Sequence, residues 1–135
     1  MSYQFSNTSL ERLATCEQGL QEVIKLAIKR SPIDFGISEG HRSVEKQQEY
    51  YSRGRTKPGK IITYVDGIKK KGKHNYDPSK AVDIYAYVNG KASWKVEHLC
   101  IIAGVVLSCS IELGVKIEWG GLWKKFKDYP HFEKD

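Results

Sequence analysis

A carboxylate in the middle of an apolar strand is the feature that most constrains the fold of this chain. Residues 81–88, AVDIYAYV, have the composition of a strand, and the Asn-Gly turn signal at 89–90 ends it. Asp83 lies between Val82 and Ile84, so strand alternation points its side chain to the opposite face from theirs. A carboxylate on a central strand is costly unless it is paired or binds a cation. The segment therefore predicts either a solvated sheet face or a built site around Asp83, and the strand alone does not choose between them.

The rest of the chain mixes helical and extended segments without a regular β-α-β rhythm. Apolar spacing and capping residues predict helices over 8–31 (from the capping box Thr8-x-x-Glu11 to Pro32), 44–51 and 94–113, and strands over 34–39 and 115–119. Ser43 and Ser93 are expected to cap the second and third helices, and Gly114 is expected to end the third. A β-branched piece at 61–65 precedes an Asp-Gly turn signal at 66–67. This mixture predicts an α+β domain whose small, mainly antiparallel sheet is flanked by helices.

Composition limits the classes of protein to which this chain can belong. Its 135 residues suffice for one core, and 22 basic against 16 acidic residues give a net charge of +6. That charge favours an anionic partner without choosing between nucleic acid, a membrane and an acidic polymer. The longest apolar run, 99–107, is shorter than the ~20 residues of a membrane span, and the N-terminus lacks the pattern of a secretory signal peptide. The three cysteines fit no metal knuckle and are expected to be buried free thiols.

Two histidines complete a set of metal-ligand types around the strand carboxylate. His74 lies in the loop before Asp83, and His131 lies near the C-terminus. Two imidazoles and one carboxylate are a donor set of catalytic zinc, which keeps its fourth position for water. His41 has no acidic partner at ligand spacing, and His98 lies within an expected helix, where we interpret it as structural. We therefore predict a metal site at His74, Asp83 and His131.

A second carboxylate is needed if the metal site is to hydrolyse a peptide bond. Asp128 precedes His131 by three residues, so both face one site only if the chain bends at 129–130, where a proline stands. Asp128 is then placed to take a proton from water and to pass it to the leaving amine. Glu133 is a competing base, because strand period puts it on the same face as His131. Weaker candidates for this base are Glu118 and Asp77.

These residues belong to a pattern that resembles the zinc peptidases of bacterial cell walls. That group includes the D-alanyl-D-alanine carboxypeptidases and the L-alanyl-D-glutamate endopeptidases used as phage endolysins, and the endolysin branch fits best, over residues 5–133. The matching segments, in order, are EGHRSVEKQQ at 39–48, RGRTKPG at 53–59, HNYDPSKAVDI at 74–84, WGGLW at 119–123 and DYPHFE at 128–133. Five pieces in the right order are a far more specific signal than any one of them.

The resemblance implies a fold, a metal and a role for each site residue. The implied fold is that of the Hedgehog and D-Ala-D-Ala peptidase group, with one Zn²⁺ on His74, Asp83 and His131. Asp128 is then the general base, and Arg42 lies beside the metal, where a guanidinium can bind the scissile carbonyl oxygen or the developing oxyanion. Gln48 is implied to help shape the substrate cleft. The expected reaction is hydrolysis of the L-Ala–D-Glu bond of the peptidoglycan stem peptide, without a covalent intermediate.

The resemblance also implies partners and a location, and it has three departures. We expect a monomeric single domain over 1–135 without a separate wall-binding domain or membrane span. We expect it to stay in the host cytoplasm until a holin lets it reach the periplasmic wall. Gly72 stands where the family often has serine, 77–78 lengthen the loop from histidine to aspartate, and Leu122 replaces a common aspartate.

Three alternatives remain open on the sequence. A D,D-carboxypeptidase would use the same chemistry to remove terminal D-Ala, and muropeptide products would distinguish it. A basic nucleic-acid-binding domain would use the lysine run at 69–71 with Lys73, Tyr85 and Tyr87, and a gel shift would detect it. A metal-free relative that only binds wall fragments would contain little zinc.

Overall fold

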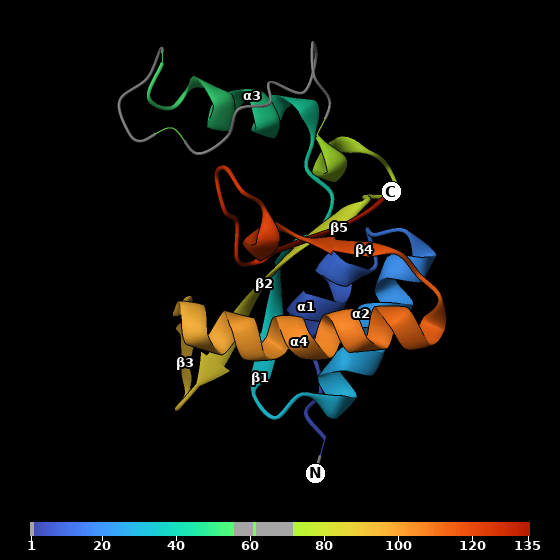
Figure 1. Cartoon of the computed structure of the whole chain (residues 1–135). Helices are drawn as coiled ribbons and strands as arrows, with labels where there is room; N and C mark the ends of the chain where they lie inside the picture. Colours follow the sequence, from blue (N-terminus) through green and yellow to red (C-terminus); the bar gives the residue numbers. More distant parts are fainter. Residues whose placement is uncertain (1, 56–60, 62–71) are drawn as a thin grey trace.

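One antiparallel sheet with helices around it forms the protein (Figure 1). The computed structural model describes residues 2–55, 61 and 72–135. The elements are α1 (Asn7–Leu13), α2 (Gln18–Arg30), β1 (Asp34–Glu39), α3 (Val44–Ser52), η1 (Lys73–Asn75), β2 (Ala81–Val88), β3 (Lys91–Ser93), α4 (Val96–Leu113), β4 (Ile117–Trp119), η2 (Gly120–Leu122) and β5 (His131–Lys134). The strand order is β1-β2-β5-β4, and β3 pairs with the last residues of β2. The α+β prediction is confirmed.

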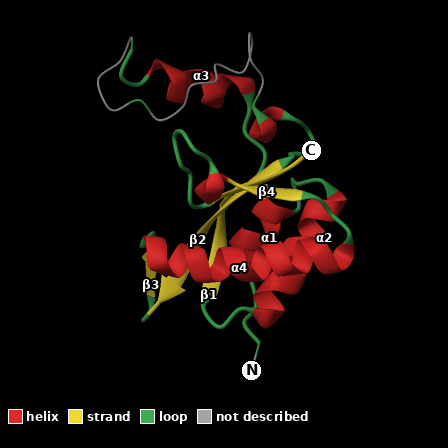
Figure 2. Ribbon diagram, in the orientation of Figure 1, coloured by secondary structure: helices red, strands yellow, loops and turns green. Residues whose placement is uncertain are grey.

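The two faces of the sheet have different surroundings. On β2, Val82, Ile84 and Ala86 are fully buried and pack in the core with apolar side chains of α2 and α4. The two helices pack against each other, and Figure 2 shows α4 crossing in front of α2. The alternate side chains of β2, those of Asp83, Tyr85 and Tyr87, point to the opposite face, which we call the site face.

The helix predicted over 8–31 is wrong, because it is two helices separated by a short extended piece. Within this piece, Cys16 forms an isolated parallel bridge with Ser79, whose N–H donates to Thr15 O (2.9 Å) and whose carbonyl oxygen accepts from Glu17 N–H (2.8 Å). The Glu17 side chain then caps α2 by accepting from Gly19 N–H at 2.9 Å. A tertiary partner interrupts the helical pattern here and anchors the chain just before β2.

Two predicted helix starts are also wrong. The Oγ of Ser6, not the capping box at Thr8, caps α1 by accepting from Ser9 N–H at 3.2 Å. Ser93 belongs to β3, a strand that the sequence analysis did not predict, and α4 begins after Lys95 without a side-chain cap. The three residues of β3 were too few to show a strand period.

The predicted helix cap at Ser43, the helix end at Gly114 and the turn at 89–90 are confirmed. Ser43 caps α3 by accepting from Lys46 N–H, and α4 ends at Gly114, whose φ of 68° is in the left-handed region. The turn at 89–90 has positive φ at both residues, as an Asn-Gly hairpin requires. The predicted β-branched piece at 61–65, apart from its first residue, and the turn signal at 66–67 lie outside the described residues.

The apolar helix α4 is a core element with one exposed side. By length and composition it is the one helix of the described chain that is apolar enough to cross a membrane, with a mean hydropathy of 1.8. Core helices pass the same test, and Leu99, Ile102 and Val106 of α4 are buried in the domain core. Its other side exposes Cys100, so the expectation of three buried thiols is wrong at this residue.

Candidate metal centre

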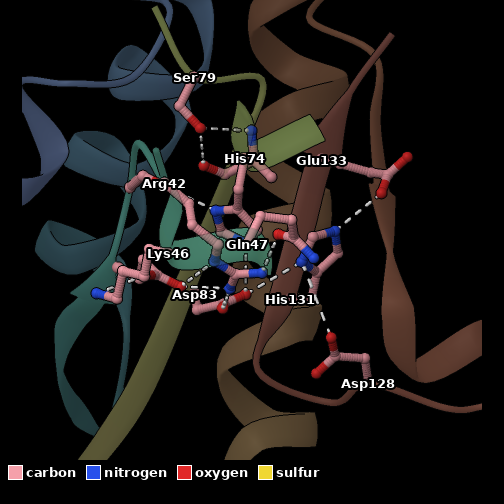
Figure 3. A network of polar contacts seen from close by, with 12 residues as sticks. Arg42, Lys46, Gln47, His74, Ser79, Asp83, Asp128, His131 and Glu133 are labelled. Carbon is pink, nitrogen blue, oxygen red and sulfur yellow. Dashed lines mark hydrogen bonds and ion pairs between the residues drawn. The ribbon is translucent and has the colours of Figure 1, made fainter. Parts of the chain in front are cut away.

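Three predicted ligands converge on the site face (Figure 3). The antiparallel register of β2 with β5 sets Asp83 directly opposite His131, and η1 brings His74 against them. Asp83 Oδ1 lies 3.1 Å from His131 Nδ1 and 3.2 Å from His74 Nε2. The three donor atoms all lie within 4.8 Å of one another, and both imidazoles are buried. Residues 57 positions apart along the chain thus form one group that can hold a metal ion.

The outer nitrogens of the two imidazoles determine which atoms face the centre. His74 Nδ1 is 2.7 Å from the carbonyl oxygen of Gly40, an acceptor only, so this nitrogen carries the proton. His131 Nε2 is 2.8 Å from Glu133 Oε1 and donates to that carboxylate. The facing atoms, His74 Nε2, Asp83 Oδ1 and His131 Nδ1, are then three acceptors. Buried His74 Nε2 has no hydrogen-bond partner in the described part of the chain. Three acceptors at this separation need a positive charge between them, which is either a proton on His131 or a metal ion.

The donor set fits a zinc ion in both spacing and chemistry. Tetrahedral bonds of about 2.0–2.2 Å hold neighbouring donors about 3.3 Å apart. The two shortest separations, 3.1 and 3.2 Å, are close to that value. Two neutral imidazoles and one carboxylate also leave a coordination position open. The residues present therefore fit a catalytic metal ion.

The pKa shifts of the centre show that it stabilises positive charge. Burial alone would raise the pKa of Asp83, but the charges and hydrogen bonds of the two imidazoles hold it well below its usual range. Burial alone would lower the pKa of His131, but its bonds to Asp83 and Glu133 raise it to about 10. In the metal-free protein a proton on His131 supplies the positive charge, and a metal ion must displace that proton to bind.

Asp128 lies at the edge of the centre, as the sequence predicted for a base. The required bend is present as a turn at 129–130, closed by a bond from His131 N–H to Asp128 O at 3.2 Å. Asp128 Oδ2 is 3.9 Å from His131 Nδ1, and its side chain is 35% exposed, so a substrate can reach it. Burial and the charge of Asp83 raise its pKa, which favours a carboxyl that can hold a proton.

Gly120 fixes the backbone that carries Asp128. Its carbonyl oxygen accepts from Asp128 N–H at 3.0 Å, and a Cβ at Gly120 would lie 2.3 Å from Asp128 O. We expect Gly120→Ala to lower the free energy of unfolding by about 1–3 kcal/mol and to lower hydrolysis at least tenfold, because Asp128 must move.

Gly104 is the matched control for this substitution. A Cβ there meets no atom within 4 Å, so Gly104→Ala should stabilise α4 by about 0.5–1 kcal/mol without changing hydrolysis. Urea unfolding and peptide hydrolysis of both variants check the pair. Equal effects of the two substitutions would contradict a specific role for Gly120.

Arg42 lies beside the centre and is held there from several sides. Its Nε and Nη2 donate to Glu39, its Nη1 donates to Gln47 Oε1 at 2.8 Å, and its Nη2 lies 3.7 Å from Asp83 Oδ2. A β-bulge after Ile37 sets Glu39 opposite Asp83 and so permits this arrangement. The guanidinium therefore adds positive charge next to the carboxylate ligand.

The neighbouring glutamines differ in position. Gln47 is buried and contacts Arg42, whereas Gln48 is exposed on α3 and stays a prediction for substrate binding. The sequence analysis did not single out Gln47. Its only signal there was its place four residues after the capping residue Ser43.

Glu133, proposed from the sequence as a competing base, contacts the outer nitrogen of His131 rather than the centre. Its strand face is the predicted one, but the bond to Nε2 makes it an orienting partner of the imidazole. The ring of Trp123, which the sequence motif contained without a role, lies 5.2 Å from that of His131 at an interplanar angle of 50°, and its Nε1 donates to Glu118. Strand period alone predicts neither contact, because each depends on side-chain direction.

Removal of the Glu133 carboxylate should weaken metal binding without removing a ligand. We expect Glu133→Ala to lower zinc affinity about 10- to 100-fold, because His131 loses the acceptor that fixes its tautomer. Glu133→Gln keeps an acceptor oxygen and should lose much less. Competitive titration against a zinc chelator measures both affinities. Equal loss in the two variants would show that charge, and not the hydrogen bond, sets the effect.

Comparisons with known proteins show the family to which this chain belongs. The family described as phage L-alanyl-D-glutamate peptidase matches residues 1–135. The chain is 39% identical over 118 residues to the peptidoglycan L-alanyl-D-glutamate endopeptidase CwlK of Bacillus subtilis (strain 168), covering 83% of this chain and 67% of that one. It is 29% identical over 130 residues to the L-alanyl-D-glutamate peptidase of Escherichia phage T5, covering 96% and 88%.

A solved structure extends the likeness to the fold. The crystal structure of the L-Ala D-Glu endopeptidase ChiX of Serratia marcescens matches with a TM-score of 0.78 and 32% sequence identity, over 99% of this chain and 91% of that one. The sequence resemblance drawn from five short motifs is thereby confirmed over the whole chain. This chain belongs to the phage L-alanyl-D-glutamate peptidase family.

Proposed function

We propose that this peptidoglycan endopeptidase hydrolyses the L-Ala–D-Glu bond of the stem peptide with a single zinc ion held by His74, Asp83 and His131. The observation that carries the proposal is the convergence of two buried imidazole nitrogens and the Asp83 carboxylate, whose donor atoms all lie within 4.8 Å of one another. Family membership supports the bond, and the donor set supports the metal. When bound, zinc supplies a Lewis acid that activates water and polarises the scissile carbonyl.

The residues of the chain then move the proton and orient the reacting groups. Asp128, at the exposed edge of the centre, accepts the proton of the attacking water and later donates it to the departing nitrogen. Arg42, held by Glu39 and Gln47, adds positive charge where the carbonyl oxygen becomes negative. Trp123 covers one side of His131 and limits the access of bulk water.

The proposal includes how the protein reaches its substrate. We propose that this one domain acts as a monomer, held in the host cytoplasm until a holin opens the route to the periplasmic wall. A wall substrate outside the cytoplasmic membrane and the family resemblance support this order of events. The basic surface charge favours approach to an anionic wall, so the rate should fall with salt.

Product analysis tests the proposed reaction directly. Purified peptidoglycan is digested with protein that has been stripped of metal by a chelator and reloaded with zinc, and the fragments are identified by mass spectrometry. The proposal expects new D-Glu amino termini and L-Ala carboxyl termini, only in the zinc-loaded sample. Release of terminal D-Ala instead would support a D,D-carboxypeptidase, and equal release by the stripped protein would contradict the role of the metal.

A D,D-carboxypeptidase and a nucleic-acid-binding domain both have less support than the endopeptidase. The curated relatives and the solved structure all have the L-alanyl-D-glutamate activity in their names. The lysine run at 69–71 lies outside the described residues, and the family match gives a nucleic-acid partner no support.

A further inference from the structure

The site face continues beyond the metal centre as a row of aromatic side chains on β2. Asp83, Tyr85 and Tyr87 alternate on this face, so Tyr85 lies about 7 Å and Tyr87 about 14 Å along the strand from the ligand. Figure 1 shows β2 running from the β5 side of the sheet, where the centre lies, toward β3. The row therefore leads from the centre to the far end of the sheet.

The aromatic row has the exposure and geometry of a binding surface. Tyr87 is 45% exposed and Trp94 is 57% exposed, although both are large aromatic residues. The Trp94 ring lies 5.9 Å from that of Tyr85 at an interplanar angle of 41°. Tyr85 also lies flat across β1, because a Cβ at Gly36 would be 2.4 Å from its hydroxyl oxygen. The glycine thus fixes one aromatic side chain, and the exposed rings flank it.

A pocket with polar groups adjoins the two tyrosines. It has a volume of about 340 Å³ and lies between the N-terminal segment, β1 and β2. Its polar side chains come from Gln4, Ser6, Ser9 and Asp34, and Asp34 is the only charged residue among the described residues that line it. Aromatic faces beside hydroxyl, amide and carboxylate groups suit a neutral ligand that has apolar ring faces and many hydroxyl groups.

We propose that Tyr85, Tyr87, Trp94 and this pocket bind the disaccharide of the muropeptide, so that the enzyme recognises the sugar as well as the peptide. The inference rests on the proposed function. In that substrate one L-Ala residue and a lactyl group separate the scissile carbonyl from the sugar ring, a span of about 7 Å. This span matches the distance from the centre to Tyr85, and a second sugar ring would reach Tyr87.

Charge favours this direction of binding over the reverse one. The peptide beyond the scissile bond bears free carboxylates, which would be repelled by Asp34 at the pocket. On the opposite side of the centre, in α3 and the residues next to it, the cations Arg42, Lys46 and Arg53 outnumber the two carboxylates with which they pair, Glu39 and Glu49. The acidic peptide therefore fits toward α3 (Figure 1), and the neutral sugar fits toward β3.

Two matched substrates test the proposal. One is the tetrapeptide L-Ala-D-Glu-diaminopimelate-D-Ala, and the other is the same peptide attached to its disaccharide. The wild type should have a kcat/KM at least tenfold higher for the sugar-bearing substrate. Tyr87→Ala and Trp94→Ala should each lower this ratio severalfold, and both together about tenfold. Ile111→Ala, 82% exposed at the other end of α4, is the control and should leave the ratio unchanged.

The outcomes separate this proposal from the proposed function. A wild type that cleaves both substrates equally, or variants that keep the wild-type ratio, would overturn the sugar site alone. A wild type that cleaves neither substrate would overturn the proposed function. As a second measurement, the peptide-free disaccharide should shift backbone amide NMR signals within 85–94 of the wild type, and Tyr87→Ala should abolish the shift. Absence of any shift at millimolar disaccharide would also count against the site.

Discussion

Replacing Asp128 by asparagine should abolish most of the hydrolysis and leave the metal bound. The amide keeps the size of the side chain but cannot accept the proton of the attacking water, a contribution of about 10²- to 10⁴-fold to the rate. Asp128 lies at the edge of the donor group, with its Oδ2 3.9 Å from His131 Nδ1, so its change removes none of the three ligands. We therefore expect kcat to fall by that factor at a zinc content close to one equivalent.

The control for this prediction is Asp77→Asn. Asp77 is an exposed carboxylate of the loop before β2, and the sequence placed it among the weaker candidate bases. Its replacement should not change kcat. Zinc content is measured by elemental mass spectrometry, and kcat is measured from the rate at which cleaved stem peptide is released. A large loss in Asp77→Asn together with near-normal activity in Asp128→Asn would assign the base elsewhere.

The second large effect is expected for His131→Ala, which should remove zinc and activity together. His131 offers Nδ1 to the centre, and its loss leaves one imidazole and one carboxylate, too few protein ligands for a catalytic zinc site. If the site binds zinc as proposed, zinc at about 1,000 times its Kd should stabilise the wild type by about 4 kcal/mol, so the wild-type Tm should rise with added zinc. The Tm of His131→Ala should not respond.

His98→Ala is the matched control for the histidine variant. His98 lies on α4, and its Nδ1 is paired with Ser93 Oγ at 2.8 Å, away from the centre. This variant should keep zinc, the zinc-dependent rise in Tm and the hydrolysis of stem peptide. If His131→Ala hydrolyses peptide at the wild-type rate, His131 is not part of the site.

The convergence of the three residues was predictable in part, because two short-range rules point to it. Alternation on β2 turns Asp83 away from the core, and the turn at 129–130 lets Asp128 and His131 approach one centre. The partner of His131 across the strands, Asp83, follows only from the register of β2 with β5. The sequence suggested that contact first through the ligand chemistry of two imidazoles and one carboxylate and then through the family resemblance, and strand period alone would not have predicted it.

What the sequence did not predict depends on contacts between distant segments or on side-chain direction. The break between α1 and α2 arises from the bridge to Ser79, 63 residues after Cys16. The role of Glu133 depends on which imidazole nitrogen it reaches, and the role of Gln47 depends on its contact with the Arg42 guanidinium. By contrast, the start of α3 was predictable from Ser43 and the end of α4 from Gly114, because each residue acts within a single helical turn.

The location of zinc in a crystal of the zinc-loaded protein tests the central claim most directly. Anomalous scattering at the zinc absorption edge should give one strong peak, with bonds of about 2.0–2.2 Å to His74 Nε2, an Asp83 carboxylate oxygen and His131 Nδ1. Glu133 should remain bonded to His131 Nε2 in that crystal. A peak that lies away from these three side chains would contradict the account. So would a crystal without ordered zinc, grown from protein that binds one equivalent of zinc in solution.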